Sequence, residues 1–267
     1  MTRRSVARRR SHLVALVSPL LVTVVLTPWL RTAQAADDDP GDELRERGRE
    51  LYVTGCSSCH GSDGSGVEAP DGSVRGPSLR RSGEAAAYYY LSTGRMPLAS
   101  SEDQPRRKRP AYSRDEIDAL VAYVASLGRG PVLPSVDPSD ADLAEGGVLY
   151  RANCQACHSA SGSGGALGYG RAAPRLGPAD PVEIAAAVRS GPGQMPVFGP
   201  DTLSNRQLAD LVRYVEHLDD PADPGGLAIG RTGPVPEGFV AWLIGMVALL
   251  VLVAWIGTRS PAGRREP

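Results

Sequence analysis

The chain contains two copies of one segment, and this repeat is the feature that most restricts its fold. GRELYVTGCSSCHG at residues 48–61 aligns with GGVLYRANCQACHS at residues 146–159, an offset of 98. Three further pairs of segments correspond in the same order: GPSL (76–79) with APRL (173–176), GRMP (94–97) with GQMP (193–196), and residues 115–127 with residues 205–218. Self-similarity of this kind indicates a duplicated unit, so we expect two domains of similar fold.

Both copies are predicted to be helical. Apolar residues recur at helical spacing in the last segment of each copy: Ile117, Leu120, Val121, Val124 and Leu127, then Leu208, Leu211, Val212, Val215 and Leu218. Helical patterns also cover 41–52, 84–94, 141–150 and 181–191, with loops rich in Gly and Pro between them. Only two Phe and three Trp are present in 267 residues. Because small domains fill their cores with difficulty, we expect a bound group to occupy the centre of each.

Each copy carries the motif Cys-x-x-Cys-His. In zinc sites, cysteine pairs of this spacing are usually separated by about 12 to 20 residues, and a thioredoxin-type dithiol belongs to a βαβ pattern that is absent here. The motif is the attachment signature of c-type haem, whose two vinyl groups form thioethers with cysteines three positions apart. We therefore predict two covalently bound haem c groups. The residues are Cys56, Cys59 and the iron ligand His60 for the first haem, and Cys154, Cys157 and His158 for the second.

Two of the four Met residues occupy corresponding positions in the repeat. Met96 follows His60 by 36 residues, Met195 follows His158 by 37, and each precedes a Pro. A thioether ligand raises the haem potential, so we predict Met96 and Met195 as the sixth iron ligands; packing in the core is the alternative role. Irons with both axial positions filled keep no open site for a substrate. The motifs therefore predict an electron carrier without catalytic residues of its own.

Apolar segments lie near both ends of the chain. Residues 1–35 combine an Arg-rich start, an apolar run and an A-x-A cleavage pattern, which predicts a signal peptide or an uncleaved N-terminal membrane segment. Residues 239–257 contain no charge, carry Trp242 and Trp255 near their ends, and precede a basic tail. This pattern predicts a transmembrane helix with a cytoplasmic C-terminus. We therefore expect a cell-membrane protein whose haem domains are extracytoplasmic.

These patterns divide the chain into units. The expected units are the leader or membrane segment 1–35, the first haem-binding domain 40–130, a linker 131–139, the second haem-binding domain 140–222, a juxtamembrane segment 223–238, the transmembrane helix 239–257 and a tail 258–267. Residues 36–257 hold 20 of the 29 basic and 29 of the 30 acidic residues, a net charge of −9, which argues against nucleic acid as a partner. The basic run Arg106–Arg109 is either a docking patch or a solvated loop.

The motifs resemble those of a known family. Class I cytochromes c cross their first and last helices at a small Gly beside aromatic residues. The corresponding residues are Gly48, Tyr52 and Tyr123 in the first copy and Gly146, Tyr150 and Tyr214 in the second. The tandem arrangement, with STGRMP, GPGQMP and the closing PGGLAIGRTGPVPEGFVAWLIGMVALLVLVAWIG, resembles the dihaem cytochrome c subunit of the actinobacterial cytochrome bc complex, a menaquinol/ubiquinol-cytochrome c reductase.

The resemblance implies a fold and a set of partners. The fold is all-α: two tandem class I cytochrome c domains plus a C-terminal transmembrane helix. The partners are cytochrome b, the Rieske iron–sulfur subunit as electron donor, and an associated cytochrome c oxidase as acceptor, with the first haem facing the donor and the second facing the oxidase. A dihaem subunit of another oxidase or dehydrogenase is the alternative, and a dihaem peroxidase, which needs one iron that opens, is a further one.

Overall fold

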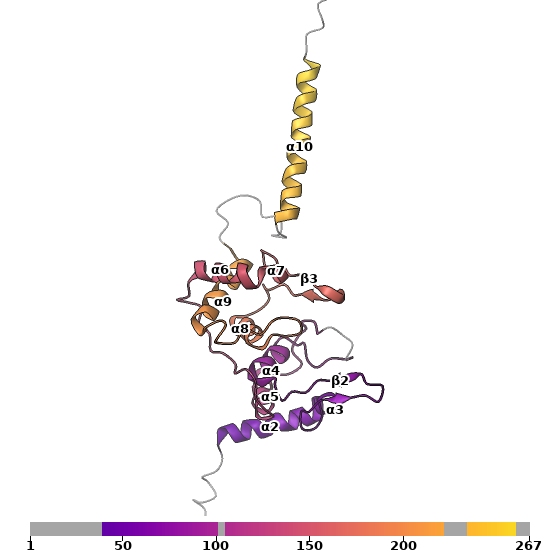
Figure 1. Ribbon diagram of the computed structural model, residues 1–267, viewed down its shortest axis with the longest axis vertical. Coiled ribbons are helices and arrows are strands. Elements are labelled where there is room, and N and C mark those ends of the chain that lie inside the picture. The colour runs from indigo at the N-terminus through magenta and orange to yellow at the C-terminus, as the bar shows by residue number, and fades with distance from the viewer. Residues whose placement is uncertain (1–38, 101–104, 222–233, 260–267) are drawn as a thin grey trace, which may run out of the picture.

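The computed structural model describes residues 39–100, 105–221 and 234–259. The segment 1–35, predicted to be a leader, and most of the tail lie outside the described residues. Two helical domains with the same order of elements are followed by one long helix (Figure 1). The predicted all-α class is confirmed.

The first domain is organised by two long helices that cross. Its helices are α2 (Pro40–Gly55), α3 (Ser57–His60), α4 (Gly83–Ser92) and α5 (Arg114–Ser126). Helices α2 and α5 cross at Gly48, where a Cβ atom would overlap the carbonyl oxygen of Ala119. Only glycine allows the two backbones to approach this closely. The rings of Tyr52 and Tyr123 pack beside the crossing with their centroids 5.1 Å apart.

The second domain repeats this arrangement. Its helices are α6 (Leu143–Asn153), α7 (Gln155–His158), α8 (Pro181–Ser190) and α9 (Asn205–Asp219). A Cβ atom at Gly146 would overlap the carbonyl oxygen of Asp210, and the rings of Tyr150 and Tyr214 lie 5.4 Å apart. Both domains therefore contain the helix crossing that the resemblance implied.

Capping boxes fix where the last helix of each domain begins. The hydroxyl of Ser113 accepts a hydrogen bond from the backbone of Glu116, whose side chain accepts one in return from the Ser113 backbone. Ser204 and Gln207 make the same reciprocal pair at the start of α9. The predicted apolar faces of α5 and α9 point inward, and Leu120 is almost fully buried at the centre of the first domain.

A short antiparallel ribbon follows the Cys-x-x-Cys-His segment in each domain. The strands are β1 (Val67–Glu68) and β2 (Val74–Gly76) in the first domain, and β3 (Gly165–Ala166) and β4 (Ala172–Ala173), with the 3₁₀ turn η1 (Gly168–Gly170) between them, in the second. The sequence pattern predicted only loops in these regions. Strands of two or three residues are too short to show the alternation that identifies a strand.

The two domains pack through α4 and α8, which lie side by side in the middle of the molecule (Figure 1). Ala186 of α8 is fully buried within the core cluster of the first domain, with Val182 and Ala187 packed against the same cluster. Arg107 of the first domain forms an ion pair with Glu183 of α8. The connection between the domains also lies on α4, because the Pro131 carbonyl accepts a hydrogen bond from the Ala85 backbone at 3.1 Å.

Helix α10 (Pro234–Thr258) stands apart from both domains (Figure 1). Its segment Gly238–Thr258 has a mean hydropathy of 2.7, and within the described part of the chain it is the one helix long and apolar enough to cross a membrane. Twenty-one residues rise about 31 Å at about 1.5 Å per residue, close to the thickness of a bilayer core. The segment overlaps the predicted span 239–257 and has the length and composition of a membrane-spanning helix.

Candidate haem-binding sites

The first Cys-x-x-Cys-His motif occupies one helical turn directly after α2. Cys56 caps the helix, its N–H donating to the Tyr52 carbonyl at 2.8 Å, and the His60 N–H donates to the Cys56 carbonyl at 2.9 Å. Gly61 then ends the turn with a φ of +79°, and its carbonyl accepts a 2.7 Å hydrogen bond from the hydroxyl of Tyr52. The buried tyrosine thus ties the end of the motif back to α2.

The second motif has the same geometry. The N–H groups of Cys154 and His158 donate to the carbonyls of Tyr150 and Cys154 at 2.8 and 2.9 Å. The hydroxyl of Tyr150 donates to the Ser159 carbonyl at 2.7 Å. Ser159 takes the place of Gly61 and adopts a φ of +65°. The turn that carries the cysteines and histidine thus forms with either glycine or serine at its end.

Each motif histidine is oriented by a proline carbonyl. Nδ1 of His60 lies 2.8 Å from the oxygen of Pro77, and Nδ1 of His158 lies 3.0 Å from the oxygen of Pro174. A carbonyl only accepts, so Nδ1 carries the proton and Nε2 keeps its lone pair for a metal. Burial lowers the pKa of His158, against the opposing effect of the Pro174 carbonyl, and so favours the neutral imidazole that a metal needs.

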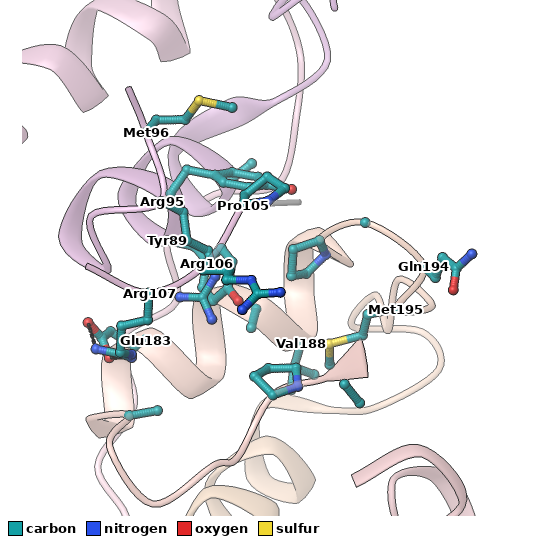
Figure 2. A pocket seen from close by; sticks show the side chains of 18 of the residues that line it. Tyr89, Arg95, Met96, Pro105, Arg106, Arg107, Glu183, Val188, Gln194 and Met195 are labelled. Carbon is teal, nitrogen blue, oxygen red and sulfur yellow. Dashed lines mark hydrogen bonds and ion pairs between the residues drawn. The ribbon is translucent and has the colours of Figure 1, made fainter. Parts of the chain in front are cut away.

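The two methionines come from the loops that follow α4 and α8. The N–H of Met96 donates to the Tyr90 carbonyl at 3.0 Å, whereas the N–H of Met195 donates to the Pro192 carbonyl at 3.2 Å. Figure 2 shows the two thioether side chains reaching into the pocket from different domains. The equivalent positions in the repeat are thus presented by loops of different local structure.

One cavity of about 1220 Å³ joins the two sites across the domain interface. Seven of the eight predicted residues line it: Cys56, His60, Met96, Cys154, Cys157, His158 and Met195. Cys59 does not line it, although it lies on the same turn as His60. The walls are largely apolar, with Leu79, Leu120 and Leu176 among them, which suits the flat apolar face of a porphyrin. The cavity, the free Nε2 atoms and the paired cysteines together fit haem c.

The cysteines lack the properties of the two alternative sites. Burial raises the pKa of Cys56, and raises that of Cys154 to about 11, whereas redox-active dithiols have a lowered pKa. The described residues contain no group of three or more His, Cys, Asp or Glu that could hold a metal ion, and a protein zinc site takes at least three such ligands. Neither a redox dithiol nor a zinc site gains support.

Sequence reasoning missed three parts of the site. The carbonyls of Pro77 and Pro174 orient the histidines, and Arg95 enters the cavity wall. Arg107 belongs to the basic run that the sequence predicted as a docking patch or a solvated loop, but its ion pair with Glu183, which joins the domains, was not predicted. A signal for the prolines was present, because GPSL and APRL correspond in the repeat. The repeat also contains Arg95 against Gln194, a difference at otherwise matching GRMP and GQMP.

Each half of the chain matches a family of known proteins. Residues 45–128 match the family model "Cytochrome c", and residues 141–215 match "Cytochrome C oxidase, cbb3-type, subunit III". The "Cytochrome bc1 complex cytochrome c subunit" of Mycobacterium tuberculosis (strain CDC 1551 / Oshkosh) is 43% identical over 271 residues, covering 97% of this chain and 94% of that protein.

Two further relatives show what the similarity covers. The protein of the same description from Corynebacterium diphtheriae is 36% identical over 277 residues, covering 97% of this chain and 95% of that protein. The "Cytochrome c6" of Leptolyngbya boryana is 40% identical over 78 residues, which is 28% of this chain and 91% of that protein. A one-domain cytochrome thus matches about one unit of the repeat, and the bc1 subunits match nearly the whole chain.

Proposed function

Because this chain belongs to the family of cytochrome bc1 complex cytochrome c subunits, we propose that it relays single electrons from the Rieske iron–sulfur subunit to a terminal cytochrome c oxidase. Its two cytochrome c domains carry covalent haem c and act in electron transfer. The names of the relatives support assembly with a bc1 complex, in which cytochrome b and the Rieske subunit would be its neighbours.

The residue assignments follow the geometry of the two sites. Cys56, Cys59, Cys154 and Cys157 would hold the haems as thioethers, and Nε2 of His60 and His158 together with the sulfurs of Met96 and Met195 would bind the irons. Bound haem supplies one-electron redox chemistry. The chain itself would bind the rings, orient each imidazole through the Pro77 and Pro174 carbonyls, and surround the rings with largely apolar walls.

The single observation that carries the proposal is the shared cavity. Ligand candidates from both domains line one volume at the packed α4–α8 interface. An electron that enters one domain can therefore pass to the other without a diffusing carrier. The apolar helix α10 holds both domains at the membrane, which keeps donor and acceptor within reach.

The proposal includes the order of the relay. The first haem faces the Rieske donor and the second faces the oxidase. In purified complex, Met96→His would lower the potential of the first haem and slow the reduction of the second by quinol. Reduction of the second haem at the unchanged rate would show that electrons do not enter through the first domain.

The partners are tested by isolating the chain from native membranes. A C-terminally tagged chain, purified in mild detergent, should bring cytochrome b, the Rieske subunit and oxidase subunits with it. Recovery with a different oxidase or dehydrogenase would favour the alternative that the match of residues 141–215 to a cbb3-type oxidase subunit suggests. A high-spin haem, or turnover of peroxide, would favour a dihaem peroxidase.

Orientation and domain limits are part of the same proposal. We place the haem domains, 40–130 and 140–222, on the outer side of the membrane and the C-terminus in the cytoplasm. In intact spheroplasts, external protease should digest the haem domains and leave a tag after residue 267 protected. Digestion of the tag would reverse the orientation.

A further inference from the structure

Arg95 is a buried cation in the cavity wall with an unused donor. Arg95 is 7% exposed, and its guanidinium carbon lies 4.7 Å from the centre of the Tyr89 ring. Within the described part of the chain, Nη1 of Arg95 is buried and has no hydrogen-bond partner. A buried charged donor without an acceptor is destabilising. The folded chain therefore needs an acceptor at this position.

The neighbouring charged groups do not supply this acceptor. Glu183 and Arg107 are the charged side chains that act on Arg95. Both carboxylate oxygens of Glu183 are within hydrogen-bond distance of the Arg107 guanidinium, at 2.5 and 3.4 Å, and the Asp180 backbone donates to one of them. Arg107 itself repels Arg95. An additional anion would satisfy the open donor.

A second buried arginine shows how this chain satisfies such a group when the role is structural. Arg189 is 4% exposed and donates to the carbonyls of Phe198 and Leu203 and to the side chain of Asn205, at 2.8, 2.7 and 2.8 Å. At the position equivalent to Arg95, the second domain has Gln194, which is exposed. Burial of an unsatisfied guanidinium in the cavity is thus particular to the first domain.

We propose that Arg95 binds a haem propionate, with Nη1 donating to the carboxylate. Haem c carries two propionates, the carboxylates that necessarily enter this cavity with the ring, and a guanidinium is the side chain best suited to a buried carboxylate. Arg95 lines the same cavity as Met96 and Met195 and is labelled with them in Figure 2, so the propionate belongs to one of the two haems that share the cavity. Arg95 is a binding residue that also sets the potential of that haem, because a fixed positive charge favours the reduced iron.

The test uses the full-length chain in detergent with both haems attached, and it rests on the haem occupancy already assigned. Redox titration followed by absorption gives the two midpoint potentials. For one of the two haems, Arg95→Gln should lower the ratio of reduced to oxidised haem at a fixed potential at least tenfold. For a one-electron couple this is a fall of ~59 mV in the midpoint potential. Arg95→Lys keeps the charge and should cause a smaller shift. Met96→His and Met195→His assign each potential to its haem, and so show whose propionate is bound.

A matched control removes a neighbouring charge. Arg106 lines the same cavity but is exposed, so Arg106→Gln should shift the same ratio by less than twofold. Resonance Raman gives an independent readout: the propionate-bending band of the affected haem should move in Arg95→Gln and Arg95→Lys and stay in place in Arg106→Gln.

Three results would overturn the proposal. One is unchanged potentials and propionate bands in Arg95→Gln when pyridine haemochrome analysis finds two haems per chain. A second is an equal shift in Arg106→Gln, which would mark a general effect of charge. If Arg95→Gln does not fold, an unmoved propionate band in Arg95→Lys decides against it. Absence of haem from the unmodified chain would instead contradict the haem assignment itself.

Discussion

The two domains are nearly identical where the haem attaches and different where they face each other. Each has a Cys-x-x-Cys-His turn closed by a tyrosine hydroxyl at 2.7 Å and a histidine held by a proline carbonyl. Helix α4, however, carries three consecutive tyrosines at 88–90, and the corresponding part of α8 has Ala186, Ala187 and Val188. The difference shows that haem attachment fixes one side of the fold and that contact between the domains fixes the other.

The small side chains of α8 explain how the asymmetric interface forms. Ala186 is fully buried in the cluster that holds Tyr88 and Tyr89, so large residues on one helix pack against small residues on its partner. Such interdigitation requires complementary surfaces. Two identical copies of either surface would not provide it, and the repeat has therefore diverged along these helices.

The largest expected effect tests whether the shared helix crossing is needed in each domain separately. Gly48→Val places a side chain on the Ala119 carbonyl and against Tyr123, which should exceed about 4 kcal/mol of destabilisation. The first domain then cannot hold Met96 opposite His60, and one haem should lose its low-spin spectrum. Electron paramagnetic resonance and thermal unfolding measure this. Gly146→Val is the mirror experiment and should affect the other haem; two native haems in either variant would contradict the crossing.

Replacing the sixth iron ligand of one haem should make the midpoint potentials of the two haems differ. Met195→Leu removes the thioether and should lower the midpoint potential of the second haem by well over ~59 mV, a tenfold change for one electron, while both covalent attachments persist. Redox titration and haem content are the measurements. Met246→Leu changes a methionine of α10 outside the cavity and should leave both potentials in place. An unmoved potential in Met195→Leu would remove Met195 from the ligand set.

The ion pair across the interface should contribute measurably to stability. Arg107→Ala leaves the carboxylate of Glu183, whose side chain is 6% exposed, without its guanidinium partner. A fully buried pair would cost about 3 to 5 kcal/mol on losing one member; since Arg107 is about one-third exposed, we expect about 1 to 2 kcal/mol by denaturant unfolding.

A second arginine–carboxylate pair provides the control for this loss. Arg175 and Asp219 form an exposed pair within the second domain at 3.4 Å, and such pairs contribute about 0 to 1 kcal/mol. Arg175→Ala should therefore change the free energy of unfolding less than Arg107→Ala. Equal losses would mean that Glu183 finds another partner when Arg107 is removed.

Alkaline pH should destabilise the first domain, in part because Tyr52 loses its proton. Burial raises the pKa of Tyr52 from 10.0 to about 12. The unfolded tyrosine loses its proton first, so the stabilisation is complete below pH 10 and is lost as the pH rises toward 12. Tyr52→Phe should remove part of this slope and, through loss of the bond to Gly61, about 1 kcal/mol at neutral pH. An unchanged slope between pH 10 and 12 would show that other groups produce it.

Local patterns predicted the attachment sites, and long-range contacts could not be predicted in the same way. The helices and both Cys-x-x-Cys-His turns follow from neighbouring residues, and Met96 and Met195 follow from position in the repeat. The carbonyl of Pro77 acts through the backbone, which every residue has, so no side chain marks it. Arg107 and Glu183 are 76 residues apart, and no periodicity links them. The unsatisfied Nη1 of Arg95 becomes visible only when all its neighbours are placed.

The smallest expected effect concerns the residue that ends each attachment turn, glycine in one domain and serine in the other. Both combine a positive φ, +79° at Gly61 and +65° at Ser159, with an extended ψ, a backbone region where a side chain costs about 1 to 3 kcal/mol. Gly61→Ser should therefore destabilise the first domain by about 1 kcal/mol, and a Cβ there would also lie 3.3 Å from the Gly66 carbonyl oxygen.

Ser159→Gly relieves the same strain but loses the 3.1 Å bond that the Ser163 N–H donates to the Ser159 hydroxyl, so its net effect should stay within about 0.5 kcal/mol. Thermal unfolding of both variants measures the difference, and a large stabilisation in Ser159→Gly would mean that the hydroxyl does not offset the strain.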